Sequence, residues 1–209
     1  MKKWMDKILL EFKKFKRAYV FLGILLLVGI ITGTFFMSML DKSDKLLVTN
    51  QLTEFFKALD NLNKVNFIDS LKSCLLGNTL SILGIWILGI SIIGIPVVLF
   101  YTYFRGFVVG FSIGSIFYLY KWKGIIVGFL YIFPHQIINL LLLLVLARYA
   151  IVFSINLFYA ITNKKGIKLH DLMRHYLKIL LIAIGTIVLT SLFEVFVTPY
   201  LLKLIKVIL

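Results

Sequence analysis

Long apolar blocks, separated by short gaps that carry lysine or arginine, make up most of this chain. Residues 19–40 hold no charged side chain over about 22 positions, and about 20 apolar residues suffice to cross the hydrocarbon core of a bilayer. The other apolar blocks are residues 75–104, 106–120, 124–147 and 179–202. A soluble core could not bury so much apolar length. The sequence therefore predicts an all-α, multi-pass integral membrane bundle of about five transmembrane helices.

The charge of the chain fits a membrane protein better than a nucleic-acid-binding one. Hydrophobic residues make up 61% of the sequence, and the formal net charge is +14. The basic residues cluster beside the apolar blocks, where such residues fix orientation and meet anionic lipid headgroups. No basic domain or basic-aromatic motif is present to bind nucleic acid. We therefore expect membrane lipids among the partners and no nucleic acid.

The charges of the connecting segments predict the topology. Residues 1–18 form a basic segment that we expect in the cytoplasm, and residues 19–209 form a single transmembrane domain. The loop 41–74 has nearly balanced charge, which suits an exported segment, whereas the basic loop 163–178 should be cytoplasmic. The predicted spans are residues 19–40, 75–100, 104–120, 134–162 and 179–202, with the C-terminus outside. A six-span count would place the basic loop outside and ranks second.

Two stretches should interrupt regular helix. Residues 124–133 are too short to cross alone, so they either re-enter the membrane and turn back at Pro134 or continue a kinked third span, since proline lacks an N–H. Gly89, Gly94 and Pro96 predict a second span that is bent or locally unwound.

Glycines spaced four residues apart predict close helix packing. Gly106, Gly110 and Gly114 form one such row, and Gly29 and Gly33 form another. Glycine has no side chain at an interface, so helix backbones can approach closely. These rows either join helices within one subunit or form the face of a homo-oligomer.

Two charged residues are expected inside the membrane. Arg148 and Glu194 each lie about 15 residues, or roughly 20 Å, from the cytoplasmic ends of their predicted spans. An unpaired charge at mid-membrane costs at least about 2.5–3.5 kcal/mol. We therefore hypothesise an Arg148–Glu194 ion pair that ties two spans together.

The exported loop contains an amphipathic segment. Leu52, Phe55, Phe56 and Leu59 recur at helical spacing, opposite charged residues. This segment is either a helix lying on the outer membrane surface or a docking face for an exported partner.

No residues suggest catalysis. Cys74 is the single cysteine, and the histidines His135, His170 and His175 lack the spacing of a metal site. No nucleophile–base cluster and no phosphate-binding loop is present. The sequence predicts no catalytic residue, no metal site, no cofactor and no enzymatic activity.

Several segments, taken in order, resemble the stage II sporulation protein M family. They are Leu-Gly-Ile-Ser-Ile-Ile-Gly-Ile-Pro at 88–96, Arg-Gly-Phe-Val-Val-Gly-Phe at 105–111, Pro134-His135, Ser-Leu-Phe-Glu at 191–194 and Thr198-Pro199. Chain length, the basic N-terminus and the single exported loop are also similar. One departure is that Gln136 and Asn139 stand where the wider family often has glycine and glutamate.

The resemblance implies a five-span, non-enzymatic scaffold in the mother-cell membrane at the septum of an endospore former. Such proteins hold stage II sporulation proteins D and P, which degrade peptidoglycan during engulfment. The alternative is a transporter or channel subunit with a midplane site between broken helices. A transporter should line a continuous polar cavity, whereas the polar residues of these spans, such as Asn139 and Thr190, look scattered over separate helices. Lipid handling in a groove between helices is a third interpretation.

Overall fold

The structure, a computed structural model, describes residues 15–60, 67–163 and 169–197. These residues form helices and no strand. The helices are α2 (Lys16–Met39), α3 (Lys42–Asp60), α4 (Phe67–Gly89), α5 (Gly94–Asn163) and α6 (Leu169–Phe196).

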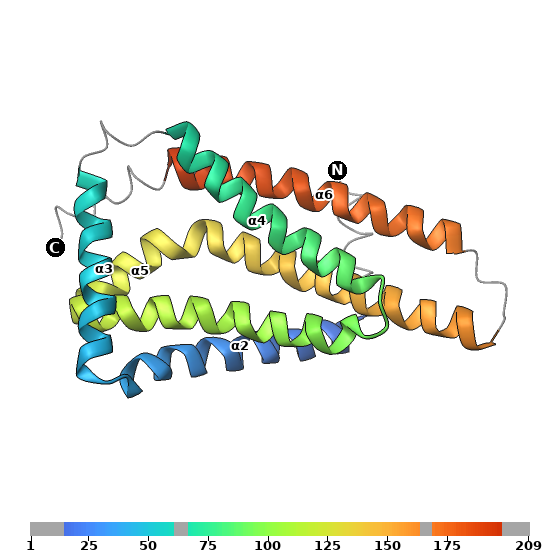
Figure 1. The fold of residues 1–209 in the computed structure, drawn as a ribbon, viewed down its shortest axis with the longest axis horizontal. Coiled ribbons are helices and arrows are strands. Elements are labelled where there is room, and N and C mark those ends of the chain that lie inside the picture. Colours follow the sequence, from blue (N-terminus) through green and yellow to red (C-terminus); the bar gives the residue numbers. More distant parts are fainter. Residues whose placement is uncertain (1–14, 61–66, 164–168, 198–209) are drawn as a thin grey trace.

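Five helical segments are long and apolar enough to cross a membrane, as the sequence predicts. They are Lys16–Met39, Phe67–Gly89, Gly94–Trp122, Gln136–Thr162 and His170–Phe196. Helix α3 is not among them: it lies across one end of the bundle, at a steep angle to the spans (Figure 1). The all-α, five-span fold class is confirmed.

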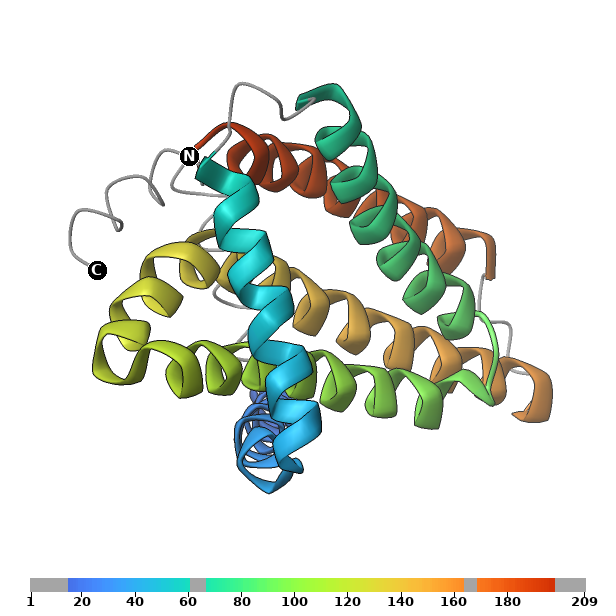
Figure 2. The same ribbon diagram turned by 60° about the vertical axis from the view of Figure 1, so that its left-hand side comes forward.

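Helix α5 supplies two of the five spans because its backbone breaks at Lys121. This residue has φ 52° and ψ −132°, which is outside the helical region, and the chain reverses direction there (Figure 2). The reversal thus comes at Lys121 and not at Pro134, so a third span continuing through residues 124–133 is wrong. Residues 124–133 are helical and belong to the second arm of α5. Their re-entry into the membrane stays a prediction.

The second and third spans also meet at a sharper break than expected. Helix α4 ends at Gly89 and α5 begins at Gly94, so the helix is interrupted where the sequence predicted a bend or local unwinding. The predicted bounds of the second span, residues 75–100, are wrong, because the turn to the third span lies at residues 90–93. A side chain on Gly94 would collide with the carbonyl group of Leu88, which explains why the chain can fold back here. Pro96 lies in the first turn of α5, where helix N–H groups have no intrahelical acceptor and proline is tolerated.

Each connection lies at one of the two ends of the bundle. The start of α2, the turn at residues 90–93, the end of α5 and the start of α6 lie at one end (Figure 1). The break at Lys121, helix α3 and the end of α6 lie at the other. Lys16, Arg17 and Arg174 belong to the first of these ends, which we call the basic end.

The core forms where α4, the second arm of α5 and α6 meet. Ile85, Leu146, Ala150 and Ile187 are almost completely buried there. Leu22 joins the same core from α2. The bundle therefore has a packed interior in addition to its lipid-facing surface.

Candidate functional site

The predicted glycines lie in a seam between α2 and the first arm of α5. Gly29 and Gly33 are buried in α2. A methyl group built on Gly29 would collide with the carbonyl oxygen of Tyr103, and one on Gly33 would collide with that of Phe107. The two backbones therefore touch at these positions, and only glycine leaves enough room.

The glycines of α5 meet α2 in the same way. Methyl groups built on Gly106 and Gly110 would collide with the carbonyl oxygens of Leu26 and Ile30, and one on Gly114 would lie 2.9 Å from that of Thr34. Thr34 also donates its hydroxyl to the carbonyl oxygen of Gly110 at 3.0 Å. The seam packs two helices of one chain, so these glycines do not face a second subunit.

The expected ion pair between Arg148 and Glu194 is not formed. Arg148 is only 3% exposed, and its guanidinium carbon lies 3.6 Å from the ring centre of Phe15 and 4.3 Å from that of Tyr149. A cation over an aromatic face is attracted by the negative ring face. Because Phe15 directly precedes α2, this contact holds Arg148 near the basic end of the bundle.

Glu194 lies much nearer the opposite end. Helix α6 begins at Leu169, about ten residues earlier than predicted, which places Glu194 about 38 Å from its start. Arg148 lies only about 22 Å from the end of α5 at Asn163. The matching depths inferred from the sequence depended on the wrong start for α6. Glu194 instead accepts a hydrogen bond from the Cys74 thiol at 3.0 Å.

The predicted docking residues lie in α3. Leu52 is half-buried, whereas the side chains of Phe55, Phe56 and Leu59 lie outside the described residues. The docking role stays a prediction. Leu46 and Leu47, which are not among the predicted docking residues, are 61% and 62% exposed on this helix.

Contacts with the bundle hold the first turn of α3 in place. The ammonium group of Lys45 donates to the carbonyl oxygen of Ser38 at 2.9 Å. It also lies 5.7 Å from the ring centre of Tyr118, on the first arm of α5. These contacts join α3 to the ends of α2 and α5.

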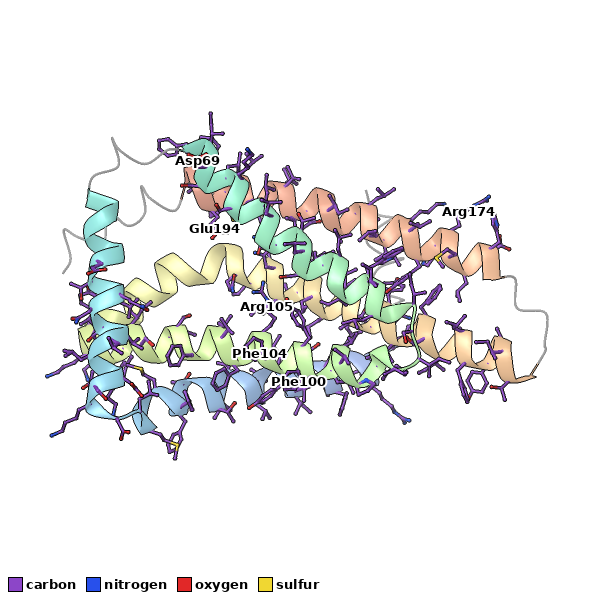
Figure 3. All side chains as sticks on the ribbon, in the orientation of Figure 1. Asp69, Phe100, Phe104, Arg105, Arg174 and Glu194 are labelled. Atoms are coloured by element: carbon purple, nitrogen blue, oxygen red, sulfur yellow. The ribbon has the colours of Figure 1, made fainter. Side chains whose placement is uncertain are left out.

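A small pocket of about 20 Å³ lies between α4, α5 and α6. Its polar walls are Asn78, Ser81, Arg105 and Asn139, and its apolar walls are Ile82, Leu142, Leu143 and Ile187. Figure 3 shows Arg105 part-way along the first arm of α5. No role was predicted for Arg105, although a lone charge inside a long apolar run was the available signal.

Residues that looked scattered in the sequence meet beside this pocket. Thr190 donates its hydroxyl to the Oδ1 atom of Asn139 at 2.9 Å, which joins α6 to α5. Asn78 lies 3.5 Å from both the Ser191 hydroxyl and the Cys74 sulfur, through its Nδ2 atom. These contacts form a polar strip from the pocket to the Cys74–Glu194 pair.

Comparison with known families identifies the chain. The model of the family described as "Stage II sporulation protein M" matches residues 22–199, which is most of the sequence. The chain belongs to the stage II sporulation protein M family. It is therefore a sporulation-related membrane protein. Comparisons with curated proteins and with solved structures gave no match.

The segments that carry the family resemblance fall at structurally distinct places. Residues 88–96 form the turn between α4 and α5, and residues 105–111 supply Arg105 and part of the glycine seam. Pro134 and His135 lie in the second arm of α5, five and four positions before Asn139. Thr198 and Pro199 lie outside the described residues. The segments that resemble the family thus include a turn, helix contacts and a residue of the small pocket.

Proposed function

We propose that this protein is a non-enzymatic membrane scaffold of the engulfment machinery. It recruits stage II sporulation proteins D and P, the peptidoglycan-degrading enzymes, and positions them at the septal membrane. Membership of the stage II sporulation protein M family carries this proposal. This is not known as an enzyme family, and we assign the cleavage of peptidoglycan to the partners.

Helix α3 is the best candidate for the docking element. It is the described helix that does not qualify as a span, and it lies across one end of the bundle (Figure 1). Its exposed leucines, Leu46 and Leu47, give it an apolar surface that a partner helix or loop can cover. The Lys45 contacts with Ser38 and Tyr118 keep that surface in a fixed position.

The proposed orientation places α3 on the outer side of the mother-cell membrane. Basic residues are enriched in cytoplasmic segments beside spans, and Lys16, Arg17 and Arg174 belong to the opposite, basic end. The N-terminus is then cytoplasmic. With five spans, the end of α6 is outside, on the same side as α3.

Affinity purification of the full-length protein from sporulating cells tests the scaffold role. We expect proteins D and P to co-purify with the wild type. The double variant Leu46→Lys/Leu47→Lys should lose them while keeping normal abundance and thermal stability. Ile161→Lys is the matched control, because Ile161 is similarly exposed but lies near the end of α5, at the basic end. Absence of both enzymes from the wild-type preparation would refute the scaffold role.

A transporter or channel subunit is the second candidate, and the charge of Arg105 at a pocket between three helices favours it. Charged residues inside a membrane commonly mark substrate or ion pathways. Under this alternative, Arg105→Gln should block sporulation while partner capture stays normal. Under the scaffold proposal, sporulation should instead fail when the α3 double variant loses its partners.

A further inference from the structure

Arg105 places a positive charge in the interior of the membrane. It lies about 11 residues after Gly94, or roughly 16 Å along a span that crosses a hydrocarbon core about 30 Å thick. Its side chain is partly exposed on the bundle. Within the described part of the chain, this side chain forms no hydrogen bond and no ion pair. A charge at this depth is costly, so a negative group beside Arg105 is strongly stabilising.

The depth of Arg105 limits where that negative group can come from. Lipid phosphates lie outside the hydrocarbon core, about 15 Å from its centre. Glu194 lies seven residues beyond Ile187, the residue of α6 at the pocket, which is roughly 10 Å further along the helix. The other acidic side chains that the structure describes lie in or next to α3, or in the first turns of α4 and α6. A second copy of this chain offers the same acids at the same depths. The remaining source is a carboxylate on a transmembrane helix of another protein.

Beside Arg105, α4 has an open face that suits the packing of a helix. Gly77, Ser81 and Gly84 are four and three residues apart, so they share one face of α4. Ser81 lines the small pocket together with Arg105, which places this face next to the first arm of α5. No atom lies within 4 Å of a methyl group built on Gly77 or on Gly84. These glycines are therefore unoccupied, in contrast to those of the seam between α2 and α5.

The arrangement of the helices allows another helix to reach this face. Helix α4 and the first arm of α5 meet at the turn of residues 90–93 and diverge toward the other end of the bundle (Figure 1 and Figure 2). Small residues let helix backbones in a membrane approach closely, so that dispersion contacts accumulate. A helix that packs on Gly77, Ser81 and Gly84 passes Arg105 near the middle of the membrane.

We propose that this face of α4, together with Arg105, binds a transmembrane helix of another membrane protein that carries one carboxylate near its middle. Gly77 and Gly84 admit the backbone of that helix. Arg105 donates hydrogen bonds to the carboxylate, since a guanidinium can donate two parallel hydrogen bonds to one carboxylate. This lateral site is independent of the docking role of α3, which lies across the end of the bundle.

Binding of a synthetic transmembrane peptide to the full-length protein in lipid nanodiscs tests the site. The probe is a leucine-alanine helix of about 21 residues with lysines at both ends and a single glutamate at its centre. Its twin carries glutamine there, and fluorescence energy transfer measures both affinities. We expect the wild type to bind the glutamate peptide at least about tenfold more tightly than the glutamine peptide. Moving the glutamate about two turns toward one end should remove this preference, because the carboxylate then lies roughly 11 Å from the depth of Arg105.

Variants of Arg105 test the charge. Arg105→Gln should remove the preference for the glutamate peptide, and Arg105→Lys should retain part of it. Arg174→Gln is the matched control, because it removes the same charge from an exposed position at the start of α6 (Figure 3). It should leave the preference unchanged. Equal binding of the two peptides by the wild type would overturn the proposal, as would an unchanged preference in Arg105→Gln.

Variants of the open glycines test the packing face. Gly77→Leu should weaken the binding of both peptides several-fold, because its side chain fills the face on which the helix packs. Gly185→Leu is the matched control: Gly185 is equally open but lies on α6, so both affinities should stay unchanged. A thermal melt of each variant checks that the fold is intact. Equal effects of Gly77→Leu and Gly185→Leu would contradict the proposed face. So would a dimer of the protein that Gly77→Leu dissociates, since a second copy would then cover this face.

Discussion

The hydroxyl group of Ser154 lies 2.7 Å from the carbonyl oxygen of Gly89, the last residue of α4. The same hydroxyl group lies 3.0 Å from the carbonyl oxygen of Ser91. The hydroxyl group of Tyr176 donates a hydrogen bond of 3.0 Å to the carbonyl oxygen of Trp86. The last four carbonyl groups of a helix lack intrahelical donors, and an unpaired polar group in a membrane is costly. Residues from two later helices thus satisfy the end of α4.

Removing these hydroxyl groups should destabilise the bundle. Ser154→Ala and Tyr176→Phe each leave a carbonyl group of α4 without its donor, so we expect each to lower the free energy of unfolding by about 1–3 kcal/mol. Denaturation in mixed detergent micelles measures this loss. Thr186→Ala is the control: its hydroxyl bonds to the carbonyl of Ile182 in its own helix, and the change should stay within about 0.5 kcal/mol. Equal losses at all three positions would contradict the assigned role.

The glycine seam predicts a sharp difference between two glycines of the same helix. Gly29→Leu should force α2 away from α5, because even a methyl group there meets the backbone of Tyr103. Gly23→Leu should be nearly neutral, since nothing lies within 4 Å of a methyl group at that position. We expect Gly29→Leu to lower the free energy of unfolding by about 1–3 kcal/mol or more. A lower melting temperature, followed by size-exclusion chromatography after heating, reports this loss. Similar melting temperatures for both variants would rule out the seam.

Arg148 and Glu194 should behave as independent residues. Side chains without a shared contact usually give additive effects, within about 0.3–0.5 kcal/mol. The stability loss in Arg148→Gln/Glu194→Gln should therefore equal the sum of the two single losses, as a double-mutant cycle measures. By contrast, Phe15→Leu and Arg148→Gln should couple, because the guanidinium lies over the Phe15 ring. A coupling energy of more than 1 kcal/mol between Arg148 and Glu194 would show that the two side chains form an ion pair after all.

The proposed orientation predicts which residues a membrane-impermeant maleimide reaches. In a Cys74→Ser background, Ser43→Cys on α3 should react in intact mother-cell protoplasts. Asp171→Cys at the start of α6 should react only after lysis, because it belongs to the basic end. Both positions are exposed, so accessibility within the protein does not explain a difference. Labelling of Asp171→Cys in intact cells would show that the protein has the opposite orientation in the membrane.

The sequence was sufficient for the architecture but not for the contacts. Apolar length and the charges of the loops together predict five spans, because hydrocarbon thickness sets the number of residues needed and the basic loop 163–178 favours an even number of crossings before it. The glycine spacing also marked the faces of α2 and α5 that meet. In contrast, the ends of helices inside one long apolar run leave little trace, so the turn after Gly89 was placed wrongly. The reversal at Lys121, where lysines interrupt the apolar sequence, comes directly after the predicted end of the third span at residue 120.

The candidate site was predicted less well, for a related reason. The depth of a side chain depends on where its helix begins, and an error of ten residues at the start of α6 moved Glu194 by about 15 Å. The partners of Asn139 and Arg105 lie on other helices, so no local spacing shows that they share a pocket. Only the packing of α4, α5 and α6 brings these residues together.

The glycine seam also bears on how the protein is made. Thr32 and Tyr103, which meet across the seam at 3.0 Å, are 71 residues apart in the sequence. At synthesis rates of about 5–20 residues per second, α2 waits several seconds in lipid before its partner emerges from the ribosome. During that interval only lipid lies beside the glycine positions of α2. This is therefore the stage of biogenesis at which an insertion chaperone can best bind α2.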